Sequence, residues 1–120
     1  MSTAPMVLVL MAAAALGAYN LWLWLRGERR PVLIGAHLLL GVGGAEALVA
    51  YLHQSSLTDD DPARQTVKLA LLLLAGSIFT GFAAPLLGKN ARGAANALLA
   101  AHVCAGLAGI FIVLTFVSRL

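Results

Sequence analysis

Long apolar runs separated by short polar segments dominate the chain. Such a run needs about 20 residues in helical form, at 1.5 Å per residue, to cross a hydrocarbon core about 30 Å thick. Backbone groups in lipid must satisfy their own hydrogen bonds, so runs of this length form helices. We therefore predict four transmembrane helices, which cover positions 6–25, 32–52, 69–88 and 94–118.

The composition agrees with a single membrane domain. Hydrophobic residues make up 61% of the chain and charged residues 11%, and the mean hydropathy is +0.91. These values lie far outside the range of soluble globular domains. The first run has no basic segment before it and is long for a signal peptide, so we expect it to be retained. The predicted fold is all-α, a transmembrane four-helix bundle of two helical hairpins in up-down-up-down order.

The charged residues predict the orientation of this bundle. Segments 26–30 and 88–92 carry five of the eight Lys and Arg residues, whereas segment 53–68 carries three consecutive aspartates. The positive-inside rule then places both basic loops in the cytoplasm and both termini outside, in a bacterial-type inner or thylakoid-type membrane. The net charge of +3 is explained by topology, and we expect no nucleic-acid partner. The five basic residues are Arg26, Arg29, Arg30, Lys89 and Arg92.

Two histidines lie inside apolar runs in matching contexts. The segments AHLLLGVGG (36–44) and AHVCAGLAG (101–109) each place a histidine after alanine and glycines four and seven positions later. Both predicted helices run outward from a basic loop, so His37 and His102 are expected at similar depth, about 10–15 Å from those loops. A shift of 64 also aligns Gly17 with Gly81, so the two hairpins are loosely repeated.

Each histidine shares its helix face with a stripe that has no side chains. At 100° per residue, the two glycines lie within about 40° and 20° of the imidazole. Such a stripe permits either close helix packing or room for a flat cofactor whose metal the histidine holds. A lone intramembrane histidine is often only hydrogen-bonded to a neighbouring helix, but a matched pair suits bis-imidazole ligation of haem iron. The four glycines are Gly41, Gly44, Gly106 and Gly109.

We therefore predict one haem b, with His37 and His102 as the metal ligands and the four glycines as part of its binding site. The sequence contains no CxxCH motif, which excludes covalent attachment of a c-type haem. The two propionates of haem b would be costly in hydrocarbon, and we expect Arg29, Arg30 and Arg92 to bind them.

With these features the chain resembles the four-helix b-type cytochromes of the inner membrane, which include di-haem electron carriers and hydrogenase cytochrome subunits. It also resembles short four-helix proteins with one haem-type histidine on helix 2 and one on helix 4. The resemblance covers all four spans and rests on His37 and His102 with their glycines. It implies transmembrane electron transfer, often to or from quinone or a partner subunit.

The chain departs from the di-haem members in one respect. His53 is about 160° round the helix from His37, and Ser118 at the matching position of the last helix cannot ligate a metal. We therefore expect a single haem near the cytoplasmic side. One haem there does not span the bilayer, so full transmembrane transfer would need a cofactor in a partner.

Glu46 is the one acidic residue inside a predicted span, and it offers a second candidate site. It lies about 180° from His37, with His53 seven residues further on. The two side chains could form a proton or quinone site. Alternatively, Glu46 forms a structural ion pair with Lys68 or Arg64, or contacts another subunit.

Two alternative functions remain, and in each case we expect other membrane or redox subunits, or further copies of the chain, as partners. The chain could be an accessory subunit of a respiratory or photosynthetic complex, cofactor-free or with a chlorophyll-type pigment on each histidine. It could be a small transporter that uses Glu46 as its coupling acid. Further expectations are interhelical hydrogen bonds from Asn20, Ser77 and Thr80, and a kink or helix end at Pro85.

Overall fold

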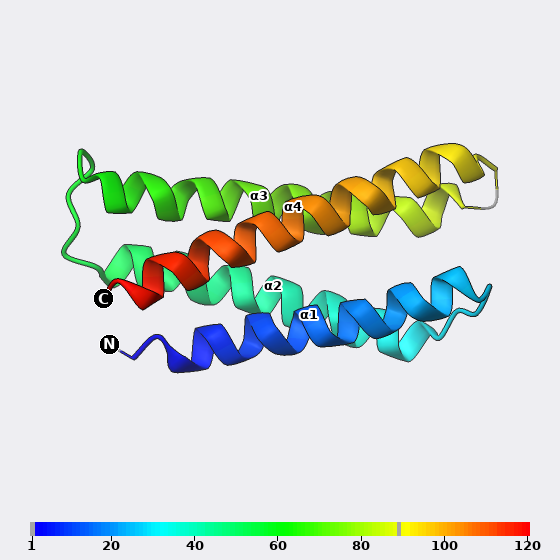
Figure 1. Ribbon diagram of the computed structural model, residues 1–120, viewed down its shortest axis with the longest axis horizontal. Coiled ribbons are helices and arrows are strands. Elements are labelled where there is room, and N and C mark those ends of the chain that lie inside the picture. The colour runs from blue at the N-terminus through cyan, green and yellow to red at the C-terminus, as the bar shows by residue number, and fades with distance from the viewer. Residues whose placement is uncertain (1, 89) are drawn as a thin grey trace.

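The structure, a computed structural model, describes residues 2–88 and 90–120, and these residues form four helices and no strand (Figure 1). All four helices are long and apolar enough to cross a membrane, which confirms the predicted all-α transmembrane fold. The helices are α1 (Ala4–Leu25), α2 (Pro31–Gln54), α3 (Pro62–Leu87) and α4 (Arg92–Ser118).

The helices pair as two hairpins. Figure 1 shows the α1–α2 and α3–α4 connections at one end of the bundle, and the two termini and the α2–α3 connection at the other. We call these the basic end and the acidic end. α4 packs most extensively on α3 and α1 on α2, whereas the hairpins meet mainly through α2 and α3. α1 and α4 have little contact, and α2 and α4 make no close backbone contact among the described residues, so α2 and α4 lie diagonally across the bundle.

Local sequence signals determine where the helices start. A proline occupies the first turn of α1, α2 and α3, where its missing N–H costs nothing. Asp61 caps α3 by accepting a hydrogen bond from the Ala63 N–H at 2.8 Å. α3 consequently begins at Pro62, and the predicted start at 69 was wrong, because hydropathy marks entry into lipid and misses a polar first turn. The other predicted bounds lie within two residues of those observed.

The connection from α1 to α2 is a Schellman-type helix end. Gly27 has φ +77°, a left-handed conformation that favours glycine. The Gly27 N–H donates to the Trp24 carbonyl at 3.0 Å, and the Glu28 N–H to the Leu23 carbonyl at 2.8 Å. This turn ends α1 at Leu25, and Arg29 follows it in the connection to α2. At the other hairpin, α3 continues for two residues past Pro85 before it ends.

The hydrophobic core lies toward the acidic end of the bundle. Its buried members come from the starts of α1 and α3 and from the ends of α2 and α4, which all lie at that end. The basic end has no comparable cluster among the described residues, and it is there that the bundle is hollow. The core consists of Met6, Leu10, Leu48, Leu52, Val67, Ala70, Leu74, Val113 and Phe116.

The outer surface of the helices is apolar. Large hydrophobic side chains such as Leu39, Leu72, Phe79 and Phe111 are at least 70% exposed. A soluble domain rarely exposes so much apolar surface, whereas lipid contact requires it. The structure is therefore that of a membrane protein whose outer faces contact lipid.

Packing of the core predicts a difference between two leucines of α2. Leu48 is fully buried and Leu39 is 75% exposed. Leu48→Ala should lower the free energy of unfolding by about 2–5 kcal/mol, because it leaves a cavity. Leu39→Ala should change it by less than about 1 kcal/mol, because its side chain contacts lipid in either state. Equilibrium unfolding in mixed micelles measures both, and equal losses would contradict this placement of the core.

Candidate functional site

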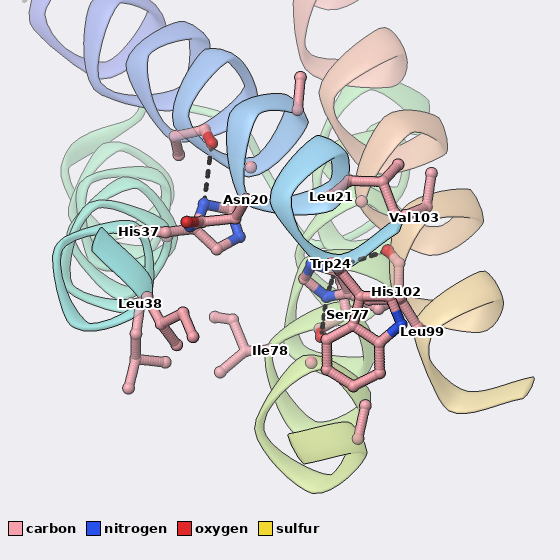
Figure 2. A pocket seen from close by; sticks show the side chains of 18 of the residues that line it. Asn20, Leu21, Trp24, His37, Leu38, Ser77, Ile78, Leu99, His102 and Val103 are labelled. Carbon is pink, nitrogen blue, oxygen red and sulfur yellow. Dashed lines mark hydrogen bonds between the residues drawn. The ribbon is translucent and has the colours of Figure 1, made fainter. Parts of the chain in front are cut away.

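His37 and His102 lie side by side in the middle of the bundle. Their ring centroids are 5.7 Å apart and their planes are at 87° to one another. They come from α2 and α4, the diagonal pair of helices, so the rings meet in the space that the two hairpins enclose (Figure 2). His37 lies about 9 Å along its helix from Pro31 and His102 about 15 Å from Arg92, by the helical rise. Both imidazoles thus belong to the basic half.

Each imidazole is held by a backbone carbonyl of the preceding helix in its own hairpin. His37 Nδ1 is 2.9 Å from the Ala13 carbonyl oxygen, and His102 Nδ1 is 2.6 Å from the Ser77 carbonyl oxygen. A carbonyl only accepts hydrogen bonds, so in the neutral rings Nδ1 carries the proton and donates it. Nε2 of each ring then keeps an unprotonated lone pair, which is the form that ligates metals.

A glycine beneath each ring makes this approach possible. A Cβ atom at Gly17 would lie 2.6 Å from His37 Cε1, and a Cβ at Gly81 would lie 2.5 Å from His102 Nδ1. In each hairpin the acceptor carbonyl comes four residues before the glycine, at Ala13 and Ser77, and the two sets are 64 positions apart. The weak sequence repeat therefore corresponds to a repeated contact, in which a histidine packs on a glycine and bonds to a carbonyl of the preceding helix.

Ser77 adds a second contact in the α3–α4 hairpin. Its hydroxyl is buried, lies 3.0 Å from His102 Nδ1 and donates to the His102 carbonyl oxygen at 2.8 Å. Gly106 leaves room for it, because a Cβ there would lie 2.8 Å from Ser77 Oγ. The equivalent Ala13 has no such group. Sequence reasoning expected an interhelical hydrogen bond from Ser77 but did not connect it with the histidine.

One cavity of about 500 Å³ lies between the hairpins and contains both imidazoles. This volume falls within the usual range of about 300–1,000 Å³ for cofactor and ligand sites. Most of the wall is apolar, from Leu10 and Ile110 at one end to the loop after α1 at the other. Gly41 and Gly106 both line the cavity, and no atom lies within 4 Å of the Cβ position at Gly41.

The other two glycines of the histidine stripes lie elsewhere. A Cβ at Gly44 would be 2.5 Å from Leu10 Cδ2, and one at Gly109 would be 3.0 Å from Leu74 Cγ. Neither glycine lines the cavity, and both are buried against a neighbouring helix. Of the four glycines, only Gly41 leaves open space beside a histidine, whereas the other three allow close contact with a neighbouring helix.

Cationic side chains stand where the cavity reaches the basic end. Arg29 and Arg30 line the cavity together with Trp24, and the Arg29 guanidinium carbon lies 3.4 Å from the centroid of the Trp24 ring. Desolvation by partial burial, and then the positive charge of Arg92, lower the pKa of Arg29. Arg92 does not itself line the cavity, but this effect places its charge close to Arg29. An anion here would meet both charges.

Acidic side chains only partly balance these cations. Glu28 lies 3.7 Å from Arg26 and 3.9 Å from Arg30, in exposed pairs of little energetic weight. Within residues 2–88 and 90–120, Arg29 and Arg92 form no salt bridge. Lys89, the remaining basic residue of these two loops, lies outside the described residues. Unbalanced positive charge therefore stands beside the cavity opening.

Asn20 is an uncharged polar residue of α1 that lines the cavity. Its Nδ2 donates to the Leu33 carbonyl on α2 at 3.1 Å, as expected of an interhelical contact. Its Oδ1 is buried and has no hydrogen-bond partner among the described residues. Thr80, for which the same kind of contact was predicted, instead bonds to the Gly76 carbonyl of its own helix at 2.9 Å, and that prediction was wrong.

The second candidate site, Glu46 with His53, does not lie in a cavity of its own. Glu46 and His53 are both exposed on α2 and neither lines the space that holds the histidine pair. Arg64 and Lys68, considered as partners of Glu46, lie instead 3.1 Å and 3.8 Å from Asp59. Of the alternatives considered for Glu46, the ion pair with Arg64 or Lys68 is therefore not formed, because both cations pair with Asp59.

The donor set limits which metals this pair can hold. Among the described residues, no group of three or more His, Cys, Asp or Glu is arranged to bind a metal ion. A zinc site built from protein ligands needs three or four of them. His37 and His102 alone are too few ligands for such a site.

Comparison with protein-family models, with curated proteins and with solved structures finds no match to this chain. A function for the cavity must therefore be argued from the positions and chemistry of its own residues.

The close approach of glycine and histidine predicts a difference between two glycines of α3. Gly81→Ala would force the His102 ring away from the Ser77 carbonyl, and should cost about 1–3 kcal/mol by overpacking. Gly76→Ala is the control, because no atom lies within 4 Å of its Cβ position. Unfolding of both variants in detergent gives the comparison. A Gly81→Ala variant as stable as Gly76→Ala would contradict the contact.

Proposed function

We propose that the chain is a membrane-embedded b-type cytochrome, an electron carrier or redox subunit, with one haem held between His37 and His102. One observation carries the proposal. Both imidazoles donate Nδ1–H to a carbonyl of the neighbouring helix, which leaves two Nε2 lone pairs in one apolar cavity. Neither neutral ring has an N–H left to offer the other, so both Nε2 lone pairs are available to bind a metal ion.

The spacing of the rings supports iron as that metal. Metal–nitrogen distances of about 2.0–2.1 Å in a linear arrangement would put two imidazole centroids roughly 6–6.5 Å apart. The observed 5.7 Å is within an ångström of this spacing. Two separate pigments, one on each histidine, would need two spaces, whereas both rings line a single cavity. This favours one shared macrocycle over the chlorophyll-type alternative.

The basic end supports haem b in particular. In the proposed complex, Arg29 and Arg30 on the cavity wall would attract the carboxylate groups of the macrocycle, and Arg92 would add its charge through space. An arginine attracts a carboxylate more strongly beside an apolar cavity than in open water, because the local dielectric constant is lower. Gly41 would leave space for the ring beside His37, whereas the space at Gly106 is taken by Ser77 Oγ.

Haem iron would supply a one-electron change between its ferric and ferrous forms. The chain's own part is to hold two neutral imidazoles and to surround them with apolar side chains. The carbonyl bonds to Nδ1 fix the orientation of each ring and make its Nε2 a stronger donor. By the positive-inside rule this site lies near the cytoplasmic face. A single haem there would exchange electrons with a partner subunit or a lipid-soluble quinone.

The first test is optical. The purified protein should show a Soret band, and a sharp α-band after reduction. His37→Ala and His102→Ala each remove one of the two proposed metal ligands, so the haem content of each variant should fall by about tenfold or more. His53→Ala is the control, because that exposed histidine lies outside the cavity. A spectrum retained in both ligand variants would contradict the proposal.

The orientation is tested by labelling single cysteines. Cys104 is first replaced by alanine, and cysteine is then introduced at Ser56, at the acidic end, or at Glu28, at the basic end. A membrane-impermeant maleimide should label Ser56→Cys in intact bacterial cells and Glu28→Cys only after permeabilisation. The opposite pattern would place the basic loops outside.

A further inference from the structure

The two imidazoles of the central pair are held by different numbers of acceptors. His102 Nδ1 lies 2.6 Å from the Ser77 carbonyl oxygen and 3.0 Å from the Ser77 hydroxyl oxygen (Figure 2). His37 Nδ1 lies 2.9 Å from the Ala13 carbonyl oxygen and has no second partner among the described residues. Ala13 occupies the position equivalent to Ser77 but carries only a methyl group. The proposed metal ligands are therefore matched in position and unequal in their hydrogen bonds.

The contacts of the Ser77 hydroxyl determine which way it points. A serine hydroxyl has one proton, and this one is donated to the His102 carbonyl oxygen at 2.8 Å. The hydroxyl oxygen can then only accept from His102 Nδ1, so the Nδ1–H is shared between two oxygens of the same residue. Ser77 is 5% exposed, so no solvent replaces these partners. The negative end of the hydroxyl dipole thus faces the His102 ring.

Gly106 creates the room for this hydroxyl. A Cβ atom there would lie 2.8 Å from Ser77 Oγ, which is too close, whereas the Ser77 Cβ atom would be at an ordinary contact distance of 3.7 Å. Gly106→Ala would consequently turn the hydroxyl away from the ring and leave the rest of Ser77 in place. The turned hydroxyl can bond to a carbonyl of its own helix, which is a common contact of serine in helices.

We infer that Ser77 is a positioning residue which makes His102 the stronger electron donor of the two ligands and so lowers the reduction potential of the haem iron. This inference rests on the proposed function. Each acceptor on Nδ1–H draws the proton away from the ring and raises the electron density at Nε2. Greater electron density at an axial ligand stabilises the ferric form relative to the ferrous form, and hydrogen bonding to the ligands is one way in which a protein sets the potential of a haem. The Ser77 hydroxyl acts on the His102 side alone.

A cycle of variants tests this inference without removing either ligand. Ser77→Ala removes the hydroxyl and keeps the carbonyl, which belongs to the backbone. Gly106→Ala keeps the hydroxyl but displaces it, and the double variant combines both changes. Ser118→Ala and Gly93→Ala are the matched controls on α4, because both residues are exposed and lie outside the cavity. The full-length protein is reconstituted with haem b in detergent, and its midpoint potential is measured by spectroscopic redox titration at one pH.

Ser77→Ala should lower the ratio of ferric to ferrous haem affinity by about three- to tenfold, corresponding to one hydrogen bond. For a one-electron couple this is a rise in midpoint potential of about 30–60 mV, at about 59 mV per tenfold change. Gly106→Ala should also raise the potential, and the double variant should match Ser77→Ala, because a hydroxyl that is absent cannot be displaced. Both controls should match the wild type, and the Soret band should persist in every variant.

Four other results would overturn the inference, and they can be told apart. An unchanged or lower potential in Ser77→Ala would show that the hydroxyl only packs α3 against α4. Shifts of Ser77→Ala and Gly106→Ala that add in the double variant would assign both to altered helix packing. Loss of haem from Ser77→Ala, with haem retained in the controls, would make Ser77 a purely structural residue. A wild type without any Soret band would overturn the proposed function, and this inference with it.

Discussion

Two hydrogen bonds from imidazole N–H groups to backbone carbonyls determine the arrangement of the central site. In a membrane interior a ring N–H has no water to bond, so it must find an acceptor on a neighbouring helix. His37 and His102 find theirs at Ala13 and Ser77, and Gly17 and Gly81 let the rings come close enough. Once both Nδ1 protons are engaged, Nε2 is the one free ring nitrogen of each imidazole, and both rings line the cavity between the hairpins.

The bundle separates this site from the contacts that stabilise it. The buried core fills the acidic end, where the starts of α1 and α3 meet the ends of α2 and α4. α1 and α4 have little contact, and the cavity between the hairpins extends to the basic end. A packed end holds the diagonal helices at a fixed distance, so the two histidines need no mutual contact of their own to stay opposed. The Schellman turn at Gly27 ends α1 just before Arg29 and Arg30, which line the cavity.

The sequence predicted the features that side-chain patterns encode. Four apolar runs predicted the helices, and the spacing around His37 and His102 predicted that both lie in the same half of the bundle. It could not predict which small residues line a cavity, because Gly41 and Gly44 look alike until a neighbouring helix is in place. The carbonyl of Ala13 has no sequence signature at all, since every residue carries one. The predicted start of α3 was wrong, because a hydropathy pattern marks apolar spans and cannot separate a polar first helical turn from a loop.

The central claim is that two imidazoles, oriented as in this structure, hold one iron. Electron paramagnetic resonance of the oxidised protein tests it most directly, because the low-spin ferric spectrum depends on the angle between the two axial ring planes. That angle is 87° here. We expect the strongly anisotropic low-spin signal of perpendicular imidazole planes, from one iron per chain. A high-spin signal, the rhombic signal of parallel planes, or no iron would contradict it.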